Sequence, residues 1–455
     1  MKTFLALAAA ALFTAAPALA QDTPLRDPVP TAPAQDAPLR VDVTDESGAS
    51  DLVIAIPAMP TSQNVQTAAG STTDLGRQIA EVIEADLRNT GLFNTIGPNQ
   101  ARGIGYTEVT SPDFTFWFGN RAQALVQGYV RASGNGLTVG CYLYDVALQT
   151  ELVRQGFVVS AGDWRRAAHK CADAIYTRLT GEGPYFDSRV VYVSETGPKD
   201  RRIKRLAIMD QDGANHRFLT NGQSIVLTPR FAPNHQSIVY MSYQNDRPSL
   251  YVYDLDSGRQ RLLVDDANLT FAPRFSPDGR WVLFSMAVGG NTDIYRVSAT
   301  GGSPQRLTNS PGIDTGGSYS PDGSRIVFES DRGGSQQLYV MNADGSGQQR
   351  ISFGGGRYAT PVWSPRGDLI AFTRLGGGAF RIGVMSPSGS GERLLTDAWG
   401  DEGPSWSPNG RVLMFFRAGQ GGGADVWSVD LTGVNARRIP TPLGGSDPSW
   451  GPLRP

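Results

Sequence analysis

The residues that most often carry chemistry are few in this chain and far apart in its sequence. It contains two cysteines, Cys141 and Cys171, and three histidines, His169, His216 and His235. Two cysteines cannot build a cysteine-rich zinc site, and a multi-histidine centre would require three separated histidines to converge. We therefore expect neither a metal centre nor a cofactor.

Three further patterns resemble catalytic or ion-binding signatures. Residues 419–424 (Gly-Gln-Gly-Gly-Gly-Ala) fit a relaxed dinucleotide-binding pattern, but the sequence predicts a strand hairpin there and no following helix. Residues 210–213 (Asp-Gln-Asp-Gly) resemble the start of a calcium loop without its glutamate. We interpret both as turns. The carboxylate pairs 265–266 and 401–402 have no assignable nucleophile, and no G-x-S-x-G motif occurs. The prediction is a protein that is not an enzyme.

Charge and composition exclude other classes. The 455 residues include 41 basic and 43 acidic side chains, which gives a net charge of −2. Binding to nucleic acid through a basic surface needs an excess of Lys and Arg, so no nucleic-acid partner is expected. The 54 glycines and 30 prolines predict many turns and few long helices. The length predicts two or three domains.

The first twenty residues have the pattern of a signal peptide. Lys2 precedes an apolar stretch over residues 4–16, and Ala18-Leu19-Ala20 matches a small-x-small cleavage site. The apolar stretch is shorter than the roughly 20 residues that span a bilayer. We expect a periplasmic protein that is not inserted in a membrane, and, because no cysteine follows the cleavage site, not a lipoprotein.

Residues 21–49 are expected to form a Pro-rich mobile arm that carries a strand segment. Prolines recur through residues 21–38, which offer almost no apolar side chains for packing. Residues 39–44 (Leu-Arg-Val-Asp-Val-Thr) then alternate apolar and polar with the strand period. Two interpretations remain: the first strand of the next domain, or a tethered strand that adds to the sheet edge of a partner.

Residues 50–183 have the pattern of a small α/β domain with two helices on a mixed sheet. One helix is predicted from residue 71 or 72 to the stop at Gly91, and another from about residue 163 to the stop at Gly181. Asn135-Gly136 predicts a hairpin turn. Cys141 on a strand and Cys171 on the second helix form either a disulfide or two buried free thiols. The predicted strands are 52–56, 124–131, 137–146 and 152–159.

The rest of the chain, residues 187–455, repeats a motif of the type Pro-x-Trp-Ser-Pro-Asp-Gly. Its period is 43 or 44 residues, which fits a four-stranded propeller blade. Six motifs and six following strands predict an all-β six-bladed propeller, closed when residues 448–450 pair beside residues 190–195. The second prolines of the motifs are Pro233, Pro277, Pro321, Pro365, Pro408 and Pro452.

The combination resembles the TolB family of the Tol–Pal cell-envelope system. The residues that carry the resemblance are Glu84–Phe93, His169–Ile175, Leu179–Gly181 and Arg189–Val193. The resemblance implies a monomeric, non-catalytic periplasmic scaffold. It would bind the peptidoglycan-associated lipoprotein Pal at the channel mouth of the propeller and TolA through its N-terminal segment, and other envelope proteins are further candidate partners. It would support outer-membrane constriction during cell division and envelope integrity.

The resemblance also implies two sets of partner-binding residues. The segment that resembles the TolA-binding sequence lies after the Pro-rich arm and comprises Leu39, Arg40, Val41, Asp42, Val43, Thr44 and Asp45. The expected Pal face comprises residues that enter the innermost strands of the blades, although packing between blades would also explain them: Thr270, Phe271, Ala272, Asp314, Thr315, Tyr358, Ala359, Asp401 and Glu402.

Two other functional classes remain open at this point. A propeller hydrolase would show a metal or a carboxylate cluster in the channel. A protein that binds a small ligand or glycan would show a closed channel with convergent polar groups. For the scaffold we add a hypothesis: the arm either docks on its own domains or reaches a partner, and binding at the propeller shifts that balance.

Overall fold

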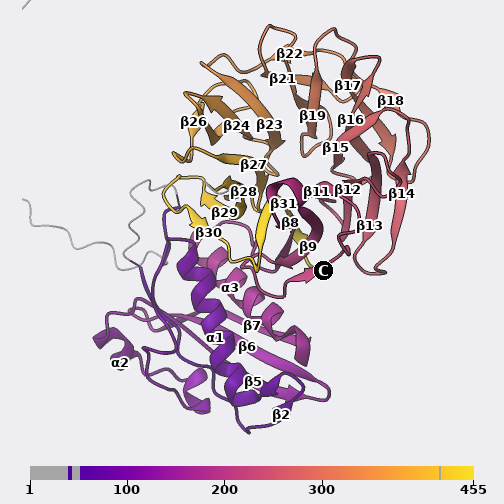
Figure 1. Cartoon of the computed structure of the whole chain (residues 1–455). Helices are drawn as coiled ribbons and strands as arrows, with labels where there is room; N and C mark the ends of the chain where they lie inside the picture. The colour runs from indigo at the N-terminus through magenta and orange to yellow at the C-terminus, as the bar shows by residue number, and fades with distance from the viewer. Residues whose placement is uncertain (1–38, 44–51, 420–421) are drawn as a thin grey trace, which may run out of the picture. The chain divides into compact units, whose positions relative to one another are not determined.

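The computed structural model describes residues 39–43, 52–419 and 422–455 (Figure 1). The predicted signal peptide, the Pro-rich residues 21–38, and Thr44 and Asp45 lie outside these ranges. Among the helices that are described, none is both long and apolar enough to cross a bilayer.

The N-terminal part is an α/β domain on a five-stranded mixed sheet, as predicted. The strand order is β4-β1-β5-β6-β7. The short strand β1 pairs in parallel with β4 and β5, whereas β5, β6 and β7 form an antiparallel meander. The strands are β1 (Val53–Ala55), β4 (Asn94–Ile96), β5 (Ala124–Ser133), β6 (Gly136–Asp145) and β7 (Thr150–Ser160), with a separate pair β2 (Gln66–Thr67) and β3 (Gly70–Ser71).

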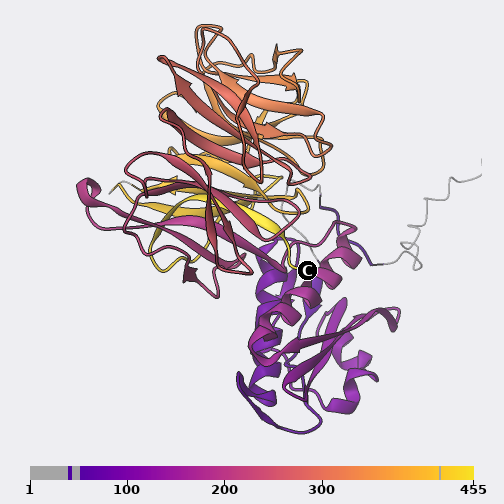
Figure 2. The same cartoon turned by 90° about the vertical axis from the view of Figure 1, so that its right-hand side faces the viewer.

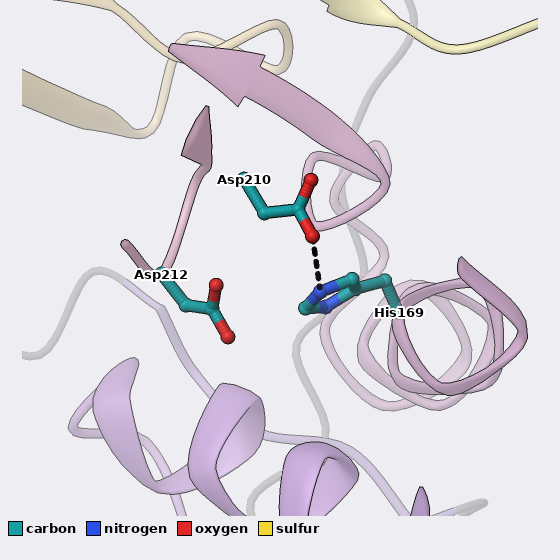
Figure 3. Close-up of side chains that lie close together, drawn as sticks. All are labelled: His169, Asp210 and Asp212. Atoms are coloured by element: carbon teal, nitrogen blue, oxygen red, sulfur yellow. Dashed lines mark ion pairs between the residues drawn. The ribbon is translucent and has the colours of Figure 1, made fainter. Parts of the chain in front are cut away.

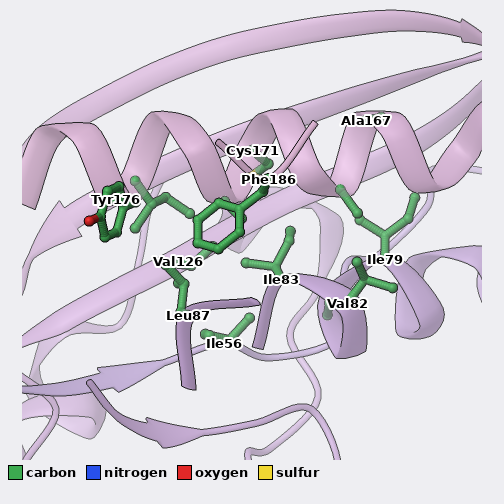
Figure 4. Close-up of a cluster of buried hydrophobic side chains, with 14 of the residues drawn as sticks. Ile56, Ile79, Val82, Ile83, Leu87, Val126, Ala167, Cys171, Tyr176 and Phe186 are labelled. Atoms are coloured by element: carbon green, nitrogen blue, oxygen red, sulfur yellow. The ribbon is translucent and has the colours of Figure 1, made fainter. Parts of the chain in front are cut away.

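The two long helices begin and end close to the predicted residues. In α1 (Thr72–Asn89) the Ser71 side chain caps the first turn by accepting from Asp74 N. In α3 (Trp164–Thr180) the cap residue Gly181 adopts a left-handed conformation with φ 75°. Apolar side chains of both helices meet those of the sheet in one buried cluster (Figure 4).

The structure contains one element that the sequence did not predict and one turn that differs from the prediction. The short helix α2 (Phe114–Gly119) was not predicted, because its six residues are too few to show a helical period. The β5–β6 hairpin turns at Gly134 and Asn135, with Ser133 opposite Gly136, and not at Asn135-Gly136. Gly134 has φ 57°, so glycine occupies the first turn position instead of the second.

The C-terminal part is a six-bladed propeller of four-stranded antiparallel sheets, as predicted (Figures 1 and 2). The last strand, β31, pairs with β8, and Trp450 lies opposite Val190. One blade therefore combines strands from both ends of this region, so the ring closes and no incomplete blade remains at either end of the array.

The propeller strands have the following bounds. The blade that closes the ring contains β8 (Ser188–Thr196), β9 (Ile203–Asp210), β10 (Arg217–Phe218) and β31 (Gly444–Leu453). The next two contain β11 (Val226–Phe231), β12 (Ser237–Ser242), β13 (Ser249–Asp254), β14 (Gln260–Val264), β15 (Leu269–Phe275), β16 (Trp281–Val288), β17 (Asn291–Ser298) and β18 (Gln305–Arg306). The last three contain β19 (Asp314–Tyr319), β20 (Arg325–Ser330), β21 (Gln337–Asn342), β22 (Gln349–Arg350), β23 (Arg357–Trp363), β24 (Ile370–Gly376), β25 (Ala379–Met385), β26 (Arg393–Leu394), β27 (Asp401–Trp406), β28 (Val412–Ala418), β29 (Ala424–Asp430) and β30 (Arg437–Arg438).

Each innermost strand contains a bulge at the same place in the repeat. The pairing register shifts there in all six blades. At the bulge one residue has positive φ, which re-aims the side chains that follow it toward the channel. These six bulge residues are Thr228, Ala272, Gly316, Thr360, Gly403 and Asp447.

Candidate partner-binding sites

The described part of the TolA-like segment, residues 39–43, lies against the folded chain. Leu39 and Val41 pack on the main hydrophobic cluster, and Val43 is buried. Arg40 and Asp42 are exposed. The predicted alternation is therefore present, but residues 39–43 belong to no sheet. The interpretation as a first strand of the α/β domain is wrong, because the described sheet contains β1 and no strand from this segment.

Two hydrogen bonds hold the segment where the α/β domain meets the propeller. Val41 N donates to the carbonyl oxygen of Leu179 in α3 (2.9 Å). Arg411 Nη2, from the turn between β27 and β28, donates to Val43 O (2.6 Å). Arg411 also pairs with Asp430 (3.2 Å). Both bonds use backbone atoms of the segment, one with the α/β domain and the other with the propeller.

The linker from α3 to the propeller is fixed by one buried carboxylate. Asp173 accepts hydrogen bonds from the backbone nitrogens of Tyr185 (2.7 Å), Phe186 (2.8 Å) and Asp187 (3.0 Å). Burial raises the pKa of Asp173 to about 6, although these three bonds act in the opposite direction. The contact orders the chain just before β8 begins.

A polar cluster also joins the two parts of the molecule, and sequence reasoning missed it. His169 of α3 is fully buried, and its Nδ1 lies 2.6 Å from Asp86 Oδ2 of α1. Its Nε2 lies 4.0 Å from Asp210 Oδ2 at the end of β9 (Figure 3). Burial alone would lower the pKa of His169, but the charge of Asp86 and the hydrogen bond to it raise the pKa to about 9. His169 is therefore a cation near pH 7.

The same cluster contains the Asp-Gln-Asp-Gly turn that resembled a calcium loop. His169, Asp210 and Asp212 lie close enough together to suggest a metal site (Figure 3). However, Arg165 pairs with Asp212 and lies 3.8 Å from Asp210, and Arg454 lies 3.6 Å from Asp210. These guanidinium groups supply the positive charge that a metal ion would supply. The arrangement therefore fits an ion-pair network between the domain and the propeller.

The cysteines were predicted either to pair or to remain buried thiols. In the structure Cys141 of β6 and Cys171 of α3 form a disulfide, with a Cα–Cα distance of 5.8 Å. The bond connects the sheet to the helix that carries His169 and Asp173.

Most of the residues expected on the Pal face lie inside the blades. Asp314 and Asp401 are fully buried. Asp314 pairs with Arg332, which lies just after β20 (2.6 Å), and Asp401 pairs with Arg417 of β28 (2.6 Å). Tyr358 is also buried. Both aspartates are the first residues of innermost strands, so these ion pairs hold the strand starts in place. The other buried members, Thr270 and Thr315, donate hydrogen bonds to Pro248 O (3.1 Å) and Glu329 Oε1 (2.5 Å).

The remaining expected residues keep part of their surface exposed. These are Phe271, Ala272, Ala359 and Glu402. Phe271 also packs on a hydrophobic cluster shared by two blades. Burial raises the pKa of Glu402, and the nearby charge of Asp447 raises it further.

A ring of exposed apolar side chains surrounds the same end of the channel. One large hydrophobic residue stands at, or up to four positions before, the start of each innermost strand. The most exposed, Phe353, exposes 73% of its surface. Sequence reasoning missed this ring because it chose residues slightly further along each strand, such as Phe271 instead of Leu269. The members of this apolar ring are Ile225, Leu269, Ile313, Phe353, Trp399 and Leu443.

Comparison with known proteins supports the family assignment. Two family models match the chain: the TolB amino-terminal domain over residues 39–152, and the TolB beta propeller domain over residues 176–454. The chain belongs to the TolB family. The resemblance that the sequence motifs indicated is thereby confirmed.

TolB proteins of other bacteria match nearly the whole chain. The Tol-Pal system protein TolB of Sphingopyxis alaskensis is 67% identical over 455 residues and covers 99% of both chains. That of Rhizorhabdus wittichii is 69% identical over 421 residues, 92% of this chain and 95% of the relative. The crystal structure of TolB from Acinetobacter baumannii superposes with a TM-score of 0.77 at 29% identity, covering 88% of this chain and 96% of that one.

Proposed function

We propose that this chain is a non-catalytic periplasmic scaffold of the Tol–Pal system. In this proposal the propeller binds Pal at the channel end where the innermost strands begin, and residues 39–45 bind TolA. By linking these partners it supports outer-membrane constriction during division and envelope integrity. Membership of the TolB family supports the assignment to this system.

The apolar ring is the observation that carries the proposal. Large exposed apolar surfaces that surround one opening are unusual on soluble proteins and mark interaction sites. Aromatic members such as Phe353 and Trp399 are the side chain types that most often dominate binding energy at interfaces. The neighbouring Glu402 and Phe271 would contribute polar and apolar contacts beside the ring.

The Pal contact is tested with charge substitutions in the ring. Phe353→Asp and Trp399→Asp should each weaken binding of purified Pal by at least tenfold, measured by calorimetry with the mature chain. Val158→Asp is the matched control, because Val158 of β7 exposes 78% of its surface outside the propeller. Equal Pal affinity in the ring variants and in wild type would refute this binding face.

The TolA contact is tested through the docked segment. If docking competes with TolA, loosening the segment should strengthen TolA binding, because a larger fraction of the chain would be competent to bind. Arg411→Ala removes the bond to Val43 O and should tighten binding of the C-terminal domain of TolA severalfold. Arg366→Ala is the control, since Arg366 contacts Glu182 and Asn409 but not residues 39–43. Unchanged or weaker TolA binding in Arg411→Ala would contradict competition.

A further inference from the structure

The other end of the propeller channel contains a cavity of about 570 Å³. It is lined by the ends of the innermost strands and by the prolines of the repeated turns, among them Pro277, Pro365 and Pro408. Its volume is within the range of sites that bind small molecules. The apolar ring lies at the opposite ends of the same strands, so the cavity is separate from the proposed Pal face.

The charged side chains in the cavity wall are both cationic. Among the described residues that line it, Arg230 of β11 and Arg274 of β15 carry charge, and no acidic side chain does. Each is partly exposed, so part of its surface faces the cavity. Arg230 Nη1 donates to the backbone oxygen of Pro229 (2.7 Å), which leaves its other N–H groups available.

The two arginines are poorly neutralised. Burial, and to a smaller extent the charge of Arg230, lowers the pKa of Arg274 to about 9. Burial also lowers the pKa of Arg230, and the charge of Asp447 offsets this in part. Two neighbouring cations in a confined channel are costly unless an anion accompanies them.

The fold places these arginines at equivalent positions of the repeat. Each stands two residues after a bulge residue, and the same position in the other blades holds a serine three times and a valine once. The serine hydroxyl oxygens accept from backbone nitrogens of the next blade: Ser318 from Trp363 (3.2 Å), Ser405 from Trp450 (2.9 Å) and Ser449 from Phe231 (3.0 Å).

Because each serine oxygen accepts a backbone N–H, its own hydroxyl proton can still be donated to another group. Among the described contacts, Ser318, Ser405 and Ser449 donate to no protein acceptor, and all three line the cavity. One layer of the channel therefore presents two guanidinium groups and three hydroxyl donors, without a competing carboxylate in the wall. Guanidinium groups bind carboxylate and phosphate oxygens through paired, charge-assisted hydrogen bonds.

We propose that the cavity binds a small soluble molecule that carries a carboxylate or phosphate group, held by Arg230 and Arg274 with help from Ser318, Ser405 and Ser449. A bare ion would fill little of the cavity, because a water-sized group occupies only about 30 Å³. The rest of the ligand would contact prolines and aromatic rings of the wall, such as Trp363 and Trp406.

Calorimetry of the mature chain with citrate and with inorganic phosphate tests this site. Saturable one-to-one binding of either probe, above that of potassium chloride at matched ionic strength, is expected, and the tighter probe identifies the anionic group. Arg274→Gln should weaken binding at least tenfold, as loss of a charge-assisted hydrogen bond predicts. Arg280→Gln is the matched control, because Arg280 pairs with Asp278 and 79% of its side chain is exposed.

A second measurement avoids dependence on a variant that fails to fold. Phenylglyoxal reacts with accessible, deprotonated guanidinium groups, and peptide mass spectrometry locates the products. In the wild-type chain, citrate or phosphate should protect Arg230 and Arg274 and leave Arg280 reactive. The absence of saturable binding of both probes, equal binding in Arg274→Gln, or equal modification of Arg274 with and without anion would each overturn the proposal.

Discussion

His169 shows how one buried side chain can join separate parts of a chain. It contacts Asp86, which lies 83 residues earlier, and its other nitrogen faces Asp210 of the propeller. The sequence predicted a turn at residues 210–213, and the structure has one there, with Gly213 N donating to Asp210 O. Local patterns reveal such a turn, but they contain no information on which distant helix its carboxylates will face.

The ionisation of His169 predicts a pH dependence of stability. Its pKa is 6.5 in the reference state and about 9 in the fold, because Asp86 stabilises the charged form. The resulting stability is fully present below pH 6.5 and is lost as the pH rises through 9. The free energy of unfolding should fall by on the order of 3 kcal/mol over this range.

His169→Gln should flatten this dependence, since the amide can still donate to Asp86 without titrating. Urea unfolding at intervals from about pH 6 to about pH 10 measures the effect. His235→Gln is the control, because burial lowers the pKa of His235 and no carboxylate raises it above its reference value. An equally steep decline in His169→Gln and wild type would contradict this account.

The disulfide predicts sensitivity to reductant. Cys141 and Cys171 are separated by 30 residues, and closing a loop of this length typically stabilises a protein by about 2–4 kcal/mol. Reduction of the wild type should lower the free energy of unfolding by that amount. The double variant Cys141→Ala and Cys171→Ala should start at the lower value and no longer respond to dithiothreitol. A urea midpoint of the wild type that reductant does not change would contradict the prediction.

Among the elements, those with a regular period were predicted well. The period of 43 or 44 residues was sufficient to predict six blades, because every blade uses the same strand and turn chemistry. The structure of segment 39–43 was harder to predict. Its alternation of apolar and polar residues indicates an extended chain, but it cannot show whether a sheet edge is available for pairing. The bulges were not predicted, since four of the six positions hold threonine, alanine or aspartate, and no pattern in the sequence marks these four for positive φ.

The repeated turns contain glycines with two different roles. Gly323, between β19 and β20, has φ 72° and open space around the position of a Cβ atom. Gly345, between β21 and β22, has φ 91°, and a Cβ atom there would collide with the backbone oxygen of Leu307 in the preceding blade. The second glycine therefore allows two blades to approach closely, whereas the first only relieves backbone strain.

Alanine substitutions should separate these roles. Gly323→Ala should destabilise the protein by about 1–2 kcal/mol, the cost of a left-handed conformation for an alanine. Gly345→Ala should cost more than that, because the Leu307 backbone must also move. The comparison requires urea unfolding of both variants under identical conditions. If the two variants were equally stable, close blade packing at Gly345 would not be the reason for glycine there.

In the whole molecule, the TolA-like segment contacts both the α/β domain and the propeller. Leu179 of α3 accepts its backbone hydrogen bond, and Arg411 of the propeller donates to it. The fold class and the closing strand were predictable because they follow from repeated local patterns. The docking of the segment was not, because Arg411 and Val43 are 368 residues apart and no local pattern links two such distant positions.

This position allows binding at the propeller to influence the segment. Coupling requires that Pal and the docked segment favour different conformations of the chain. Couplings between two sites are typically about 5- to 150-fold in affinity. Deleting residues 21–46 removes the segment together with the arm and should change the affinity for Pal by a factor in that range. Deleting only residues 21–38 removes the arm, keeps the docked residues 39–43, and should leave the affinity near that of the wild type.

Pal is titrated by calorimetry into the mature wild type, the chain lacking residues 21–46 and the chain lacking residues 21–38. The three affinities show whether Pal binding is coupled to the segment. Because coupling of binding free energies is reciprocal, saturating Pal should also change the affinity of the full chain for the TolA domain by the same factor. Agreement between the two factors would identify residues 39–43 as the coupled element. Equal Pal affinity in the wild type and in the chain lacking residues 21–46 would show that Pal and the segment bind independently, and the scaffold would then hold its two partners without communication between them.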